Sequence, residues 1–310
     1  MTKRFLFLLI AMLGMTLHAK AQNSVFKELV PSDGSYGLFT DFHFAPLHTD
    51  LERMALRGKV QMVIEEGKRC GTKYEETYTF DEHGKLKSIV KPLYEMGTDK
   101  KAGVTDMAIF EYNEAGLLKK ITEMSHDQIY DRWEEKKNIT TLVYDGKLPQ
   151  KEFFNGKETW LYSYKDNHLA SVHQTTEYDS YNFTYTPQGW LIGNALDKGP
   201  FYRKRLTYDA NGRCIGYSMK YEEHSPDGDY CEESNVKFTY NDKGDIIKAT
   251  ANNYPLNKYG KRIGKPTIFI TTVSYKYDAS GNWTEAIVKR GVGKEAINIF
   301  EAKRIIIYQK

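Results

Sequence analysis

The side chains of this chain that are able to do chemistry are thinly spread, and the histidines are the first to consider. His43 and His48 lie five residues apart beside a predicted turn, and His168 and His173 share no clear face of a strand. Neither pair has the one-turn helical spacing with which two histidines hold zinc. Asp227-Gly228-Asp229 offers two carboxylates, whereas Ca²⁺ takes about six to eight oxygen ligands. These residues predict no metal site and no cofactor.

Carboxylates are frequent, but most of them recur at one position of a repeated pattern, where a turn already explains them. The sequence has no Gly-x-Ser-x-Gly elbow, no Cys–His signature and no glycine-rich phosphate loop. The chain is therefore predicted not to be an enzyme. The competing hypothesis is a hydrolase or metal-dependent enzyme built on the variable loops, such as Glu223–Asp229 and Asn252–Gly260.

The three cysteines are too few, and odd in number, for a disulfide scaffold. Cys214 follows a turn glycine at an apolar position and is expected to be a buried thiol. Cys231 should lie opposite Glu222 or Glu223 in a hairpin, which disfavours a bridge to Cys214. Cys70 is expected to be a free cysteine in a loop.

Aromatic side chains are the remaining candidates for binding, since the chain has 23 tyrosines. An aromatic face with a polar edge suits a sugar or a peptide. Packing within a long sheet is the alternative for each of them. The weak binding candidates are Tyr130, Trp133, Trp160, Tyr178 and Tyr181.

A short phrase that recurs from residue 78 onward indicates how these residues are positioned. It consists of two aromatic or apolar positions two residues apart, then Asp or Asn, two residues, Gly, and an apolar residue two beyond. Five copies keep this form, and a sixth keeps the frame without the acid. The copies are Tyr78–Leu86, Phe110–Leu118, Phe183–Leu191, Leu206–Cys214, Phe238–Ile246 and Tyr275–Trp283.

Each phrase predicts a β-hairpin. Residues two apart share a face of a strand, Asp or Asn starts a turn, and Gly supplies the positive φ of a bulged turn. The second aromatic should then face the apolar residue after the glycine. The expected pairs are Phe80 with Leu86, Tyr112 with Leu118, Tyr185 with Leu191, Tyr240 with Ile246 and Tyr277 with Trp283. The glycines expected at positive φ are Gly84, Gly116, Gly189, Gly212, Gly244 and Gly281.

The phrase resembles the YD (RHS-type) repeat, and the resemblance extends from Tyr78 to Tyr308. In that family, found among large secreted and cell-surface proteins, the repeats coil into an antiparallel sheet that can form a shell around a cargo. This chain has fewer and more irregular units and no obvious cargo domain after Tyr308. It looks more like a short secreted member, and the cage function is not expected of it.

The first residues predict export. Residues 1–21 have a charged start, an apolar run from Phe5 to Leu17 and a small-x-small site at Ala19-Lys20-Ala21, as in a secretory signal. The apolar run is too short to span a bilayer. With three of the 44 basic residues in this segment, the mature chain balances its 41 acids. A neutral chain argues against nucleic-acid binding.

These observations predict an all-β fold, a curled antiparallel sheet of consecutive hairpins over residues 57–310. Residues 22–56 should form a short irregular or helical cap. The function expected is a non-enzymatic binding or structural module, exported to the periplasm, cell surface or medium of a bacterium. Its partner would be an envelope protein or a glycan, with no transmembrane anchor in the mature chain. An outer-membrane β-barrel is a further alternative, because short alternating strands also suit it.

Overall fold

The computed structural model describes residues 56–309, apart from short gaps at 128–131, 134–137, 176–179, 186, 188–190, 197–202, 211–212, 226–227 and 293–294. The predicted signal and nearly all of the predicted cap lie outside the described residues and stay predictions. The described residues contain strands and turns and no helix. None of them therefore forms a helix long and apolar enough to cross a membrane.

The described chain forms 19 strands in one sheet. The first ten are β1 (Val60–Arg69), β2 (Thr72–Phe80), β3 (Leu86–Tyr94), β4 (Lys101–Tyr112), β5 (Leu118–Asp127), β6 (Arg132–Trp133), β7 (Asn138–Asp145), β8 (Leu148–Phe154), β9 (Lys157–Lys165) and β10 (His168–Gln174). The others are β11 (Ser180–Tyr185), β12 (Leu191–Leu196), β13 (Arg203–Tyr208), β14 (Cys214–Ser225), β15 (Gly228–Tyr240), β16 (Ile246–Pro255), β17 (Thr267–Tyr277), β18 (Trp283–Val292) and β19 (Glu295–Tyr308).

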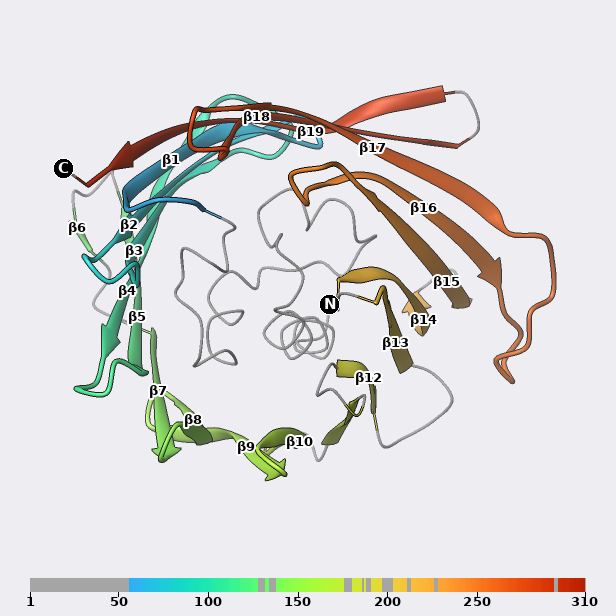
Figure 1. Ribbon diagram of the computed structural model, residues 1–310, viewed down its shortest axis with the longest axis horizontal. Coiled ribbons are helices and arrows are strands. Elements are labelled where there is room, and N and C mark those ends of the chain that lie inside the picture. Colours follow the sequence, from blue (N-terminus) through green and yellow to red (C-terminus); the bar gives the residue numbers. More distant parts are fainter. Residues whose placement is uncertain are drawn as a thin grey trace.

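The predicted fold class is confirmed, because each strand pairs antiparallel with its neighbour in sequence, except that β7 pairs with β5, which also pairs with the two-residue β6. The structure adds one pairing that the sequence did not predict. β1 pairs with β2 on one side and with β19 on the other, so the series of pairings returns to its first strand. Figure 1 shows β18 and β19 lying beside β1 in the curled arrangement. We call the β1–β19 pairing the seam.

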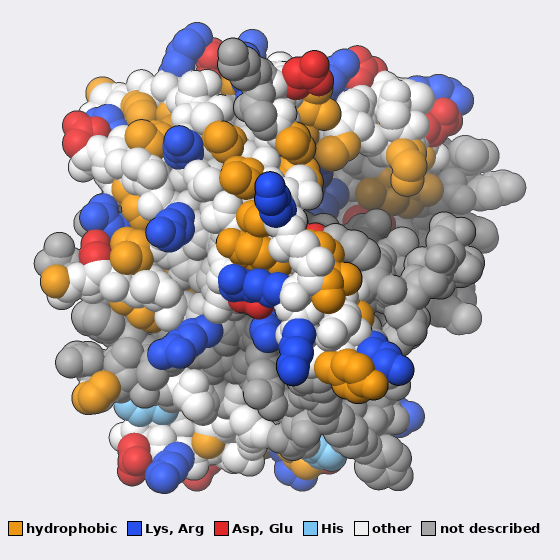
Figure 2. Space-filling view, turned by 90° about the vertical axis from the view of Figure 1, so that its right-hand side faces the viewer, with side chains coloured by type: hydrophobic (Ala, Val, Ile, Leu, Met, Phe, Trp, Pro, Cys, Tyr) orange, Lys and Arg blue, Asp and Glu red, His pale blue; other side chains and the backbone are white. Residues whose placement is uncertain are grey.

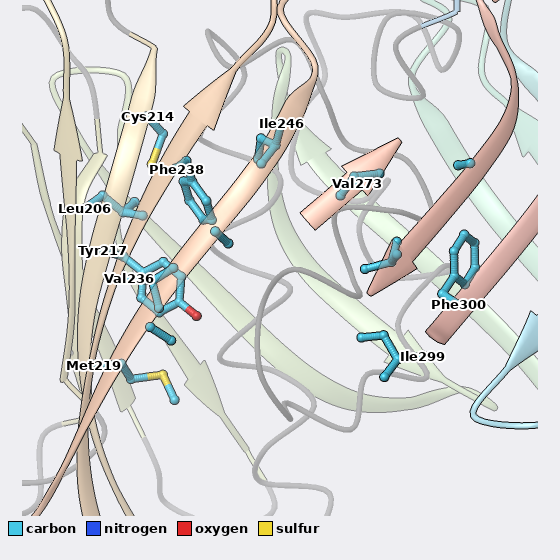
Figure 3. Close-up of a cluster of buried hydrophobic side chains, with 14 of the residues drawn as sticks. Leu206, Cys214, Tyr217, Met219, Val236, Phe238, Ile246, Val273, Ile299 and Phe300 are labelled. Carbon is cyan, nitrogen blue, oxygen red and sulfur yellow. The ribbon is translucent and has the colours of Figure 1, made fainter. Parts of the chain in front are cut away.

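One face of the sheet is buried and the other is exposed, with the alternation expected of a strand. Along β19, Phe300, Ala302 and Arg304 are buried, whereas Glu301 and Lys303 between them are exposed. The larger of the buried clusters runs over strands β9, β10 and β13–β19. Figure 3 labels ten of its side chains: Leu206, Cys214, Tyr217, Met219, Val236, Phe238, Ile246, Val273, Ile299 and Phe300.

The predicted register is confirmed at all five aromatic–apolar pairs. In each, the last residue of one strand faces the first residue of the next across a bulge, as in Phe80 with Leu86 and Tyr277 with Trp283. The φ angles are 76° at Gly84, 75° at Gly116, 85° at Gly244 and 80° at Gly281. Gly189 and Gly212 lie outside the described residues.

Two segments expected as loops are partly strand. The Glu223–Asp229 region is a hairpin in which β14 continues to Ser225 and β15 begins at Gly228. The second segment, Asn252–Gly260, begins as the end of β16. The first segment lengthens a hairpin, because its backbone is paired up to Ser225 and Gly228. The second segment is a loop only from residue 257 onward.

The described phrase turns all lie at the same end of the strands. We call this end of the sheet, where strands turn into their neighbours, the phrase edge. The turns β2–β3, β4–β5, β13–β14, β15–β16 and β17–β18 lie there, because strand direction alternates along the sheet. The opposite edge holds the connections β1–β2, β3–β4, β8–β9, β14–β15, β16–β17 and β18–β19.

Candidate functional site

The acid of the phrase is occupied by its own turn. Asp81 Oδ1 accepts hydrogen bonds from the backbone N–H groups of His83 and Lys85, both at 2.8 Å. The Gly84 N–H donates to the Asp81 carbonyl at 3.1 Å. Four further turns repeat the bond from the side-chain oxygen to the N–H four residues on, at Asn113, Asp209, Asn241 and Asp278. These side chains therefore hold the hairpins together.

The second tyrosine of the phrase joins neighbouring hairpins. Tyr112 Oη donates to the Leu86 carbonyl at 2.9 Å, and Tyr144 Oη donates to the Leu118 carbonyl at 2.8 Å. Tyr240 makes the same bond to the Cys214 carbonyl. Each acceptor is the apolar residue two positions after the glycine of an earlier phrase. The sequence predicted the face on which these rings lie, but not this link between successive turns.

The two ends of the described chain meet at the phrase edge through Asn282, which is 2% exposed. Its Oδ1 accepts from the Arg57 N–H at 2.7 Å, and its Nδ2 donates to the Arg57 carbonyl at 2.9 Å. The same Nδ2 lies 2.8 Å from Tyr308 Oη, which donates to Asp278 Oδ2. Asn282, which stands between Gly281 and Trp283 in its phrase, thus binds a residue near each end of the described chain.

A buried ion pair crosses the seam. Arg304 Nε donates to Glu65 Oε2 at 2.7 Å, and the two side chains are 1% and 0% exposed. They are direct partners in the β1–β19 register. The Arg304 guanidinium also lies 3.5 Å from the centre of the Trp283 ring. Two charges withdrawn from water are tolerable only when they compensate each other in this way.

Tyrosines complete the cluster around this pair. Tyr74 Oη donates to Glu65 Oε1 at 2.8 Å, and Tyr78 donates to Glu76. Burial, reinforced by the neighbouring carboxylates, raises the pKa of both phenols well above the ordinary value. They therefore stay protonated and act as donors. Lys91 pairs with Glu76 at 3.2 Å.

The cluster is well suited to holding strands and poorly suited to catalysis. Its carboxylates are engaged by a guanidinium, an ammonium and two phenols, which leaves little freedom to move a proton. Among the described residues, no group of three or more His, Cys, Asp or Glu is placed to hold a metal ion. Trp283 Nε1 is buried and has no hydrogen-bond partner within the described part of the chain.

The structure places one of the five aromatic binding candidates. Trp160 lies on β9, is 8% exposed and belongs to the larger core cluster. It packs in the sheet and does not offer an exposed ring. Nothing is described for the side chains of the other four candidates, Tyr130, Trp133, Tyr178 and Tyr181.

The opposite edge holds a feature that the sequence analysis missed. Asn257 Oδ1 accepts from the N–H groups of Tyr259 and Lys261, both at 3.0 Å, and Gly260 has a φ of 72°. Leu256 and Arg262 form an isolated bridge with the six-residue spacing of the phrase pairs. This is a further phrase-like turn, in which an exposed arginine takes the apolar position. The Asn-x-x-Gly spacing was available in the sequence to reveal it.

This turn opens a loop, residues 257–266, which we call the basic loop. It contains Lys258, Lys261, Arg262 and Lys265, and no acid occurs between Ile246 and Tyr277. Tyr259 and Ile263 are 70% and 63% exposed. The loop lies at the lower right of Figure 1, in orange.

Comparisons with known proteins add little to this description. No family model matches the chain, and no curated protein matches it. Among solved structures, it is similar to a porin-like protein from Bacteroides uniformis ATCC 8492, with a TM-score of 0.37 and 10% sequence identity. The match covers 80% of this chain and 98% of that chain. At this TM-score the similarity carries no argument.

Proposed function

We propose that the chain is an exported, non-enzymatic binding or structural module of a bacterial envelope. The sequence of residues 1–21 supports export, because it combines a charged start, a short apolar run and a small-x-small site. The resemblance of the phrase to the repeats of secreted YD proteins agrees with it.

The observation that carries the non-enzymatic part is the use of the repeated polar residues. Asp81 and its counterparts bond their own turns, and Tyr112 and its counterparts bond the preceding turn. The buried Glu65 and Arg304 neutralise each other. Groups held this firmly make a scaffold, and the surface of such a scaffold serves for contact.

The exposed face of the last strands favours water over lipid as its surroundings. Charged side chains stand on this face in the middle of β18 and β19, at Lys289, Glu301 and Lys303. A lysine on a lipid-facing strand costs about 2–4 kcal/mol near the bilayer centre. This supports a water-exposed sheet over the membrane-embedded alternative.

Cell fractionation with mass spectrometry of the N-terminus tests the proposal. We expect a chain that begins at Gln22, outside the cytoplasm, and a Leu9→Arg variant that keeps its first residues and stays inside. Recovery of the unprocessed wild-type chain from the cytoplasm would overturn export. Turnover of a substrate by the purified chain, abolished by loop substitutions, would overturn the non-enzymatic part.

A further inference from the structure

The basic loop is the most strongly charged exposed segment that the fold and the proposed function leave unexplained. Lys258, Lys261 and Lys265 are exposed and form no ion pair with a described residue. Arg262 differs, because Glu233 accepts from its Nε at 3.1 Å and from a terminal nitrogen at 2.6 Å. The loop therefore has three lysines without an ion pair among the described residues and one arginine whose charge is neutralised. The Lys258 ammonium lies 5.1 Å from the centre of the Tyr259 ring.

The loop is held in one shape by its own backbone and its neighbours. The Asn257 N–H donates to the Lys261 carbonyl at 2.9 Å, and the Ile263 N–H donates to the Pro255 carbonyl at 3.0 Å. Lys220 Nζ donates to the Gly260 carbonyl at 3.1 Å. The Arg262 guanidinium covers the Tyr254 ring at 3.9 Å. Because this shape exists before any partner arrives, binding through the loop would lose little conformational entropy.

Two apolar side chains stand among the lysines. Tyr259 follows Lys258, and Ile263 lies between Lys261 and Lys265. Both are more exposed than large hydrophobic residues usually are, at 70% and 63%. Figure 2 views the side of the molecule on which β16 and β17 lie, and it shows Lys and Arg side chains interspersed with hydrophobic ones.

We propose that the basic loop docks the protein on an anionic lipid surface. Lysines near such a surface are attracted to acidic headgroups, while a tyrosine and an aliphatic chain enter the boundary between headgroups and acyl chains. A soluble polyanion would satisfy the lysines but gives Ile263 no role. The inference names a partner for the binding module proposed above and rests on that proposal for its place in the cell.

Vesicle binding by the purified mature chain tests the inference separately from export. We expect the chain to sediment with vesicles of phosphatidylcholine and phosphatidylglycerol, and not with phosphatidylcholine alone. A Lys258→Gln, Lys261→Gln, Lys265→Gln variant should bind roughly 100-fold more weakly, because each lysine near the surface contributes about a five-fold factor. Added salt should weaken wild-type binding.

A matched control separates the loop from net charge. Lys237, Lys248 and Lys289 are exposed on strands β15, β16 and β18, away from the loop, and their triple Gln variant has the same net charge as the loop variant. We expect its affinity for the vesicles to be within about two-fold of wild type. The mature chain is neutral, so the charge of the loop, and not the net charge of the chain, determines this affinity. Equal loss in the two triple variants would overturn the inference.

A second variant distinguishes lipid from polyanion. Tyr259→Ser with Ile263→Ser keeps every charge and should weaken vesicle binding roughly ten-fold, because no apolar group then enters the interface. If this variant binds vesicles as well as wild type and a soluble anionic polysaccharide displaces it, the proposed lipid partner is wrong. That result would indicate a polysaccharide as the partner. Both residues are exposed, so the unfolding transition should be unchanged.

Discussion

The phrase edge and the opposite edge lie at the two ends of the same strands. Both contain the same type of turn, but in different surroundings. At the phrase edge, the position two residues after the turn glycine holds a buried apolar residue such as Leu86 or Trp283. Several turns there are tied to an earlier one by a tyrosine, as by Tyr112 at Leu86. At the opposite edge, the phrase-like turn at Asn257 places Arg262 in that position, exposed to water. The same turn geometry therefore carries a buried side chain at the phrase edge and an exposed side chain at the opposite edge.

The phrase specifies the backbone of a turn, and its variable positions decide whether that turn is buried. An Asx residue and a glycine are sufficient to build the turn. Whether the turn is buried depends on the residues around it, because apolar side chains there gain free energy from burial and charged ones lose it.

The largest expected effect lies in the seam, which stands apart from both edges. Arg304→Met should lower the free energy of unfolding by about 3–5 kcal/mol, since it leaves the Glu65 carboxylate buried without its partner. Urea unfolding followed by circular dichroism measures it. Adding Glu65→Gln should recover part of the loss. A loss under about 1 kcal/mol would contradict a seam that depends on this pair.

Glycine substitutions compare the two edges directly. Gly281→Ala should cost more than Gly244→Ala, because a Cβ at Gly281 meets Arg57, whereas the space at Gly244 is open. Both have positive φ, so Gly244→Ala alone should cost about 1–2 kcal/mol. At the opposite edge, Gly264 lacks positive φ and its Cβ would meet only Pro255 Cγ at 3.3 Å. Gly264→Ala should change stability by less than about 0.5 kcal/mol, as measured by urea midpoints. A loss equal to that of Gly281→Ala would contradict the assignment of the Gly281 cost to its positive φ and its contact with Arg57.

Removing one hydroxyl tests the tyrosine link. Tyr112→Phe should cost about 1 kcal/mol, because the Leu86 carbonyl loses its donor. Tyr259→Phe is the matched change at the opposite edge, where the ring is 70% exposed, and it should have no measurable effect. Thermal unfolding of the two variants decides between them. Equal shifts would mean that the link does not stabilise the phrase edge.

The smallest effect expected is a pH dependence at the opposite edge. Hydrogen bonding to Arg262 is the main cause that lowers the pKa of Glu233. The folded pKa lies below the unfolded one, so this stabilisation is present above the unfolded pKa. It is lost as pH falls through the folded value. Wild type should lose up to about 1 kcal/mol more than Arg262→Gln between pH 6 and pH 3, since the pair is partly exposed. Unfolding curves at both pH values measure the difference, and parallel losses would contradict it.

Much of the fold could be predicted from the sequence, because each phrase specifies a hairpin through residues that are close together in the chain. Phe80 and Leu86, or Tyr277 and Trp283, are six residues apart, and the turn between them sets their register without help from distant parts of the chain. Antiparallel pairing in sequence order follows from consecutive hairpins. The site was less predictable. Of the binding candidates, Trp160 packs in the core, and the turn at Asn257 went unrecognised because its flanking positions carry Leu256 and Arg262 in place of the usual aromatic and apolar residues.

Only the tertiary structure decided that the last strand pairs with the first. Glu65 and Arg304 are 239 residues apart in the chain, and no local pattern distinguishes them from the other charged residues of alternating strands. They meet because twist and curvature accumulate over many strands and return β19 to β1. Local residue types determined each hairpin, whereas the sum of small rotations determined which charges were buried together.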